Sequence, residues 1–272
     1  AYPEGKWAAR ASWYYWINFP LWMASLAVMC PELLRDITGR QMGTIASLAV
    51  QLLFIWIVTL IACYPVCDSI VILNVSAVIK ILLALLVGGL GVWYISRYGF
   101  VNDMSARTFL PSFDLTSLSY ITVIIFNFLG FEVVCTYANN MSDPKKQIPQ
   151  SIVTGGIVIA AIYLFSAFGI GAAVDVHEIS VDSGLIDAVS LILGADGGVL
   201  VGVVALLFLV TLFGNMISWS MGVNSTAALA ADHNDMPRIF AKRWAKNNMP
   251  VGSAVASGVV ASGVCILGVL IE

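Results

Sequence analysis

The sequence is poor in charge and in the side chains on which most enzymes depend. Only 11% of its residues are charged, against about 25% in ordinary soluble domains, and it has two histidines. No span gathers the His, Asp and Glu residues that a membrane enzyme would hold at one depth. The net charge of -3 gives no basic excess for nucleic acid. We therefore expect no catalytic residues, no cofactor and no nucleic-acid partner.

The five cysteines do not follow a disulfide or metal pattern. At least four of them fall inside or at the edge of apolar spans, where a cysteine usually serves as a small core residue. Cys63 and Cys67 are one helical turn apart, but no histidine accompanies them. We expect no metal site.

Long apolar runs dominate the sequence. Hydrophobic residues make up 60% of it, and the mean hydropathy is +0.91. The runs are about 20 residues long, as transmembrane helices require, and not the short alternating segments of a membrane barrel. We predict an all-α polytopic membrane bundle that forms a single domain over residues 1–272. The predicted spans are 7–29, 43–66, 69–95, 116–140, 152–174, 199–231 and 251–271.

The fourth span has an unusual centre. Residues 120–140 read YITVIIFNFLGFEVVCTYANN, with Asn127, Gly130 and Glu132 at mid-depth. A charged side chain there costs roughly 2.5–3.5 kcal/mol, so such residues commonly mark a substrate or ion pathway. Glycine allows a helix to open, and opened backbone at membrane depth is tolerated where it lines a cavity or is buried in protein. We predict a broken helix at a binding site, interrupted at Gly130.

The third span carries Lys80 about a dozen residues from either end. Snorkelling to the membrane surface works poorly from that depth, so we expect Lys80 to point into the bundle toward carbonyls, a carboxylate or water. Two roles stay open. Burial disfavours the charged form of a lysine, which makes Lys80 a candidate proton carrier. Alternatively, Lys80 is a static cation that fills an ion site.

The sixth span is long and has a polar, small-residue face that includes Gly214, Asn215 and Ser218. This face favours a helix lining a wet path, and its alternative is interhelical packing through serine and asparagine hydrogen bonds. The end of this span, 224–232, is expected to emerge from the bilayer.

The loops and one glycine motif also give local predictions. GGLG at 88–91 indicates close helix packing. SDPKKQIPQSI is read as a compact loop with Pro149 in the first turn of the next helix. Residues 187–193 are expected to form a short interfacial helix. The amphipathic stretch 238–245 is expected on the membrane surface.

Two motif regions resemble the amino acid–polyamine–organocation transporter superfamily. FNFLGFE…NNMSDPKKQIPQSI is similar to the sixth helix and following loop of that family. WSMGVNSTAALAADHNDMPRIFAK…NMPVGSAV is similar to its eighth helix and loop. Within the superfamily, the glutamate–GABA antiporter group looks nearest, through Gly222 three residues after Trp219 and through the NNMSDP loop. Lys80 departs from that group and resembles the lysine with which other members replace a bound sodium ion.

The resemblance implies a fold of twelve helices, ten of which form two five-helix inverted repeats. Seven spans would then be helices three to nine, and the chain a fragment without the first two and the last helices. The absent first helix would bind the substrate carboxylate.

The resemblance also implies roles for individual residues. Phe126 would be an aromatic gate, carbonyls near Phe126 and Leu129 would accept the substrate ammonium, and Trp219 would face the path. Met23 falls where an arginine antiporter contacts the guanidinium, which disfavours arginine as substrate. The expected substrate-binding residues are Phe126, Asn127, Leu129, Gly130, Trp219 and Met23. The expected coupling residues are Lys80, Glu132 and Asn215, with Asn215 as a partner of Lys80.

The function expected from these features is secondary active amino acid transport by alternating access. The transporter would be a multi-pass protein of the inner (cytoplasmic) membrane, working as an exchanger or a proton-coupled permease. Its partners would be an amino acid, the lipid bilayer and, as a candidate coupling ion, the proton; no oligomeric state is predicted. A seven-helix receptor or other non-transport membrane protein is the alternative. A retinal protein carries its lysine in the last helix, however, whereas Lys80 lies in the third span.

Overall fold

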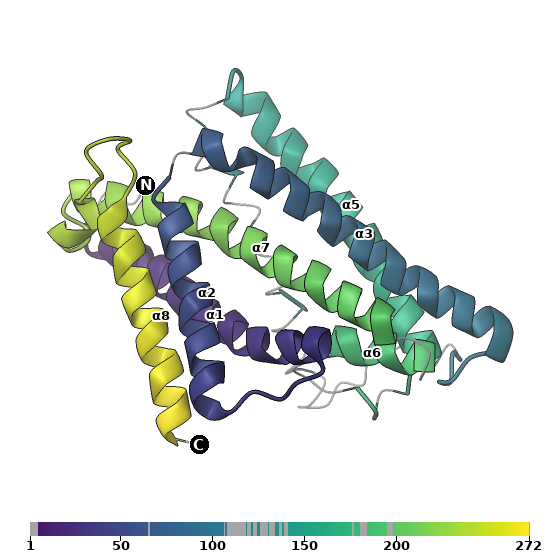
Figure 1. Ribbon diagram of the computed structural model, residues 1–272. Helices are drawn as coiled ribbons and strands as arrows, with labels where there is room; N and C mark the ends of the chain where they lie inside the picture. The colour runs from purple at the N-terminus through teal and green to yellow at the C-terminus, as the bar shows by residue number, and fades with distance from the viewer. Residues whose placement is uncertain are drawn as a thin grey trace. The chain divides into compact units, whose positions relative to one another are not determined.

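The computed structural model describes residues 5–64, 66–105, 107, 118, 121, 124–125, 130, 134–135, 138, 141–175, 177–179, 184–194 and 198–271. These residues form helices and no strand. The helices are α1 (Gly5–Thr38), α2 (Thr44–Ala62), α3 (Val66–Tyr98), α5 (Pro144–Ala173), α6 (Gly184–Leu193), α7 (Gly198–Asp232) and α8 (Val251–Ile271), with the 3-10 helix η3 (Arg238–Ala241) (Figure 1). Within this part of the chain, six helices are long and apolar enough to cross a membrane. The predicted polytopic helical bundle is therefore confirmed.

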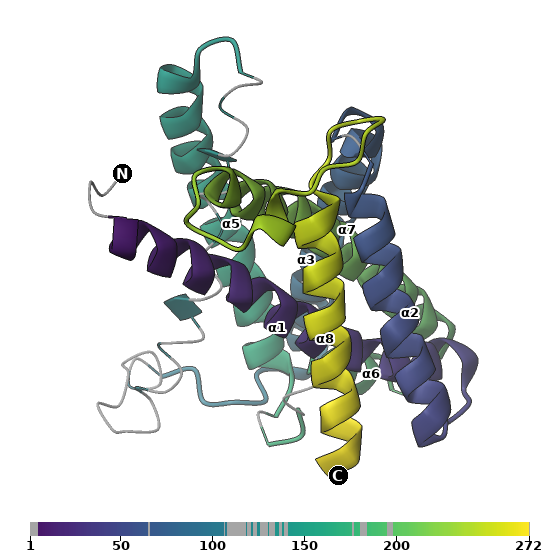
Figure 2. The same ribbon diagram turned by 90° about the vertical axis from the view of Figure 1, so that its left-hand side faces the viewer.

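The chain divides into two compact units, and the boundary falls inside α3, after Lys80. The first unit contains residues 1–80 and 199–272. In it α1, α2 and α8 pack against one another, and Figure 2 shows α2 and α8 side by side. Apolar side chains such as Phe54, Ile55 and Val58 of α2 are buried there. Phe54 also meets Phe213 of α7, with ring centroids 4.5 Å apart.

The second unit, residues 81–198, is built on a close contact between α3 and α5 (Figure 1). A Cβ atom added at Gly91 would overlap the backbone of Gly169, and one added at Gly169 would lie 2.6 Å from the carbonyl oxygen of Gly88. The Ser166 hydroxyl also donates a hydrogen bond across the contact to the Ala84 carbonyl at 2.9 Å. The close helix packing predicted from GGLG is therefore confirmed. Glycine allows the two backbones to lie this close together because it has no Cβ atom.

The far ends of α3 and α5 are also joined. The Asn102 amide donates to the carbonyls of Gly171 and Val174, at 2.8 and 2.6 Å. Ala188 and Ile192 of α6 pack beside Ala173 and Val174 in a small buried cluster. The short helix predicted at 187–193 is therefore confirmed, beginning three residues earlier at Gly184.

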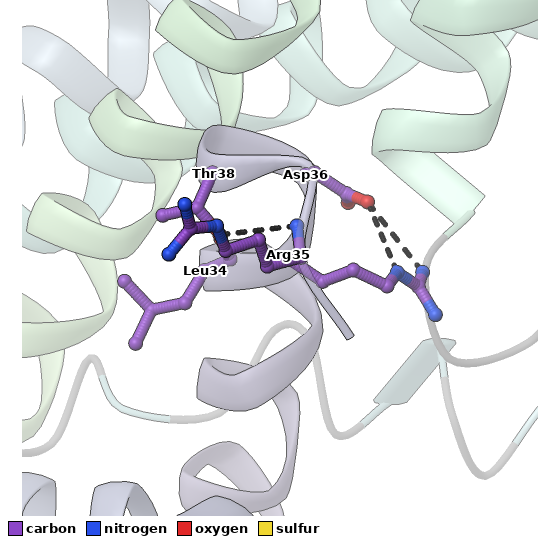
Figure 3. A network of polar contacts seen from close by, with 5 residues as sticks. Leu34, Arg35, Asp36 and Thr38 are labelled. Atoms are coloured by element: carbon purple, nitrogen blue, oxygen red, sulfur yellow. Dashed lines mark hydrogen bonds and ion pairs between the residues drawn. The ribbon is translucent and has the colours of Figure 1, made fainter. Parts of the chain in front are cut away.

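Two helix boundaries predicted from the sequence are wrong. α1 continues to Thr38, through Pro31, although Met29 was its expected end. It stops where Gly39 takes a φ of +68°, a conformation that favours glycine. Figure 3 shows its last turn, where the Thr38 hydroxyl donates to the Leu34 carbonyl at 2.7 Å.

The other wrong boundary is the start of α5. SDPKKQIPQSI is largely helical, not a loop, because α5 begins at Pro144 with Pro149 inside it. Proline suits the first helical position, where its missing N–H has no partner to lose. The side chain of Gln147 further accepts a hydrogen bond from the Asp143 N–H at 3.3 Å, which fixes the helix start. The stretch 238–245 contains only the short η3, ending at Ala241, as regular structure.

The predicted fourth span lies largely outside the described residues. Gly130 is described, and it is not helical: its φ is +108°. A side chain at that φ is strained, so glycine is the residue that fits. The conformation of Gly130 is compatible with the predicted interruption, which stays a prediction because residues 126–129 and 131–133 lie outside the described residues.

Candidate functional site

The site begins with Lys80, an exposed residue of α3 whose side chain reaches α7. Its Nζ donates a hydrogen bond to Asn215 Oδ1 at 3.0 Å. Asn215 is half-buried, and it is the partner expected from the sequence. A lysine ammonium has three donors, so this bond leaves two for other groups. The contact is present, whereas the role of the pair in coupling stays a prediction.

Lys80 and Asn215 line a cavity of about 140 Å³ between α3 and α7 in the first unit. Its other polar lining comes from three hydroxyl side chains, and the complete set is Leu73, Ser76, Ala77, Lys80, Thr211, Gly214, Asn215 and Ser218. No carboxylate belongs to this described lining. A cavity of this size holds several waters. The arrangement is one positive charge in a small hydroxyl- and amide-lined space, which is suited to holding a cation in place of a mobile ion.

A close approach between the two helices shapes this cavity. A Cβ atom added at Gly214 would overlap the side chain of Ser76, which is itself buried. Glycine at this position therefore allows α3 and α7 to come together beside Lys80. Gly214 belongs to the polar face singled out in the sequence, and here that face lines a cavity.

Further along α7 the same polar face turns into interhelical packing. Asn224 is 1% exposed, and its Oδ1 accepts hydrogen bonds from Ser253 Oγ at 2.7 Å and Ser257 Oγ at 3.1 Å. Its Nδ2 donates to Ser220 Oγ at 2.8 Å, and the Trp16 indole donates to Ser257 Oγ at 3.0 Å. The part of this face around Asn215 therefore lines a cavity, and the part around Asn224 serves interhelical packing. Sequence reasoning did not find the partner serines of α8.

Trp219 lies one turn from Asn215 on α7 and is half-buried. Its ring meets Trp22 of α1 at a centroid distance of 5.3 Å and an interplanar angle of 80°. The ring of Tyr15, also on α1, has its centroid 6.5 Å from that of Trp219, and the two ring planes are inclined at 37°. The richness of α1 in aromatic residues is visible in the sequence, but which rings face Trp219 is not.

The structure does not bring the remaining predicted site residues to the Lys80 cavity, or does not describe them. Met23 is 1% exposed and does not line the Lys80 cavity. It is a core residue of the first unit, and its contact with a substrate stays a prediction. The predictions for Phe126, Asn127, Leu129 and Glu132 lie outside the described residues.

A second cavity, of about 150 Å³, lies in the first unit around the end of α1 and was not predicted. It is lined by Pro31, Glu32, Arg35, Gln41, Met42 and Ser47. Arg35 pairs with Asp36 across 3.4 Å (Figure 3), so its charge is partly balanced.

Comparison with protein families gives one match over nearly the whole chain. The family model described as "Amino acid permease" matches residues 2–271. A match of this extent covers both units and every helix described above.

Comparison with individual proteins gives relatives that are named as transporters. The chain is 55% identical to the probable agmatine/putrescine antiporter AguD of Lactococcus lactis subsp. lactis over 98% of its own length and 58% of the relative. It is 24% identical to the glutamate/gamma-aminobutyrate antiporter of Lactococcus lactis subsp. cremoris over 58% of the chain and 32% of the relative. It is 26% identical to the putrescine transporter PotE of Haemophilus influenzae over 56% of the chain and 34% of the relative. The chain thus matches little more than half the length of the first relative and about a third of the length of the other two.

Proposed function

The chain belongs to the amino acid permease family, and from that premise we propose that it serves an antiporter exchanging agmatine for putrescine or closely similar organic dications. It is a multi-pass membrane protein of a transporter family. The observation that carries the substrate is the 55% identity, over 98% of the chain, to a relative named as an agmatine/putrescine antiporter. The proposal therefore replaces the amino acid substrate expected from the sequence by a polyamine-type cation.

The charges of the two proposed substrates determine what their binding site must provide. Agmatine carries a guanidinium and an ammonium at neutral pH, and putrescine carries two ammonium groups. Neither has a carboxylate, so a site for them needs cation acceptors and apolar surface rather than an anion-binding helix end. Their one-for-one exchange moves no net charge and needs no proton.

A fixed cation suits such an exchanger. We assign Lys80 the static role, in which its ammonium occupies the place of a coupling ion and is held by Asn215 at 3.0 Å. In that role the charge of the α3–α7 cavity stays constant through the cycle. The cavity then needs neither sodium nor proton release to complete exchange.

A counterflow screen in proteoliposomes containing the complete gene product tests this function. Vesicles are loaded with one unlabelled compound, and uptake of labelled agmatine, putrescine, arginine and glutamate is measured at two pH values. We expect uptake of agmatine and putrescine in vesicles loaded with either compound, at similar rates at both pH values. Uptake of glutamate alone would instead support an exchanger of the kind represented by the glutamate/gamma-aminobutyrate relative.

A further inference from the structure

The second cavity, at the end of α1, is lined by a half-buried carboxylate, that of Glu32, and we call it the Glu32 cavity. The other charge in its lining, Arg35, pairs with Asp36 across 3.4 Å (Figure 3). Among the described residues, no ion pair includes Glu32. Arg40, the next charge along the chain, is exposed and does not belong to the lining. The three charges at the cavity therefore sum to one negative charge.

This charge is opposite in sign to that of the Lys80 cavity. There the described lining contains one ammonium and no carboxylate, so an organic dication is repelled. At the Glu32 cavity the net charge attracts cations, and the C-terminal end of a helix such as α1 adds a partial negative charge. Of these two cavities, the Glu32 cavity is therefore the one that suits a cationic ligand.

The polar lining of the Glu32 cavity matches the donors of a primary ammonium. An ammonium has three N–H donors, and Glu32, Gln41 and Ser47 each contribute a side-chain oxygen that can accept one. These acceptors come from α1, from the connection after it and from α2. Pro31 and Met42 add apolar surface to the same lining, on which an alkyl chain can pack. Agmatine and putrescine both present an alkyl chain that ends in a primary ammonium.

The basic residues at the two ends of α2 indicate which side of the membrane the Glu32 cavity faces. The segment 233–250 adjoins the end of α2, where the Asn247 amide donates to the Cys63 carbonyl at 2.8 Å. Four basic residues belong to that segment, namely Arg238, Lys242, Arg243 and Lys246. The opposite end of α2, beside the cavity, has only Arg35 and Arg40 near it in the described chain. The positive-inside rule therefore assigns the segment to the cytoplasm and the cavity to the outer side.

We propose that the Glu32 cavity is an outer capture site for the primary ammonium of an organic dication, with Glu32 as its counter-ion. This inference rests on the proposed function, since it takes agmatine and putrescine as the exchanged cations. A carboxylate at the outer surface raises the local concentration of a cation and so speeds its capture. The site acts before the transport step, so its loss weakens uptake at low substrate concentration and leaves the maximal rate unchanged.

Uptake of labelled agmatine and putrescine by intact cells that express the complete gene product tests the site from outside. Glu32→Gln should raise the half-saturation concentration of both compounds about fivefold, with a maximal rate per transporter within twofold of wild type. Glu32→Asp keeps the charge and should recover most of the loss. Glu178→Gln is the matched control, because it removes an exposed glutamate that does not line the cavity, and its half-saturation concentrations should equal those of wild type.

Salt separates capture by charge from a purely structural effect. An increase in external sodium chloride from about 20 to about 200 mM shortens the Debye length about threefold. The half-saturation concentration of wild type should therefore rise severalfold, and that of Glu32→Gln should rise less than half as much. Equal salt responses in the two proteins overturn the capture site.

Should Glu32→Gln not fold, Gln41→Ala removes one acceptor at an exposed position and should raise the half-saturation concentration about twofold. An unchanged half-saturation concentration in the variant that folds, or a fall in maximal rate alone, overturns the capture site. The proposed function then still stands if wild-type exchange of the two cations is intact. Wild-type protein that takes up neither cation overturns both.

Discussion

Lys80 Nζ donates a hydrogen bond to Asn215 Oδ1 across 3.0 Å and so joins α3 to α7 at the wall of a polar cavity. The two residues are 135 positions apart in the chain. Lys80 is the last residue of the first unit along α3, and the same helix continues into the second unit.

Removing that charge should impair exchange. Lys80→Met keeps an unbranched side chain one atom shorter but loses the ammonium. A hydrogen bond involving a charged group contributes about 1.5–3 kcal/mol. We expect agmatine–putrescine exchange to fall at least tenfold, measured as the initial counterflow rate per reconstituted protein. Lys145→Met, at the exposed start of α5, is the control and should exchange normally. A wild-type rate in Lys80→Met would remove Lys80 from the mechanism.

The contact between α3 and α5 should tolerate no added atom at Gly91. Gly91→Ala places a methyl group against the backbone of Gly169, which cannot yield as a side chain can. Overpacking of this kind costs about 1–3 kcal/mol. We expect a lower midpoint of thermal unfolding for the detergent-solubilised protein, followed by tryptophan fluorescence.

Gly89 provides the control for this contact. It lies on the same turn region of α3, and a Cβ atom there meets nothing within 4 Å. Gly89→Ala should leave the midpoint unchanged or raise it slightly, because alanine in a helix interior is favoured over glycine by about 0.5–1 kcal/mol. Equal midpoints for Gly91→Ala and Gly89→Ala would show that the close approach does not stabilise the fold.

The Asn224 network should stabilise the junction of α7 with α8. Asn224→Leu removes one acceptor of Ser253 and of Ser257 and the donor to Ser220. As donors, the two α8 hydroxyls keep only their bonds to the backbone carbonyls of Asn224 and Ser253. Each hydrogen bond lost contributes about 0.5–1.5 kcal/mol. We expect a clear loss of thermal stability. Ser262→Ala is the comparison, since Ser262 bonds only to the Gly258 carbonyl of its own helix, and it should unfold near the wild-type midpoint.

Gly130 should resist replacement for a backbone reason. Its φ of +108° is strained for any residue with a Cβ atom, at a cost of about 1–3 kcal/mol. We expect Gly130→Ala to lower the exchange rate severalfold even where folded protein is recovered. Gly263→Ala tests for a general glycine effect, because Gly263 is inside α8 with open space around it. Normal exchange in Gly130→Ala would mean that the interruption at Gly130 does not serve transport.

Much of the first unit could be predicted from the sequence. Hydropathy located the membrane helices because each is a continuous apolar run, and Lys80 had to find a partner because a charge at mid-depth is costly. Asn215 was expected as that partner from the resemblance to the transporter superfamily. The helices and the need for a partner follow from local composition, which a single sequence contains.

Other features depend on how helices are registered against one another. Which serines of α8 meet Asn224, and which rings of α1 meet Trp219, follow from rotation and depth that composition does not specify. The start of α5 was missed because Pro149 resembles a first-turn proline, whereas Pro144 holds that position. The end of α1 was missed because the helix continues through Pro31, a residue type that usually ends or kinks a helix.

Uptake of labelled agmatine into putrescine-loaded vesicles tests the central claim most directly. Proteoliposomes containing the complete gene product are compared with the same vesicles left empty, at equal pH on both sides. We predict rapid uptake only in the loaded vesicles, with one putrescine released for each agmatine taken up and no response to an imposed membrane potential. Equal uptake into empty vesicles, or none into loaded ones, would contradict the account.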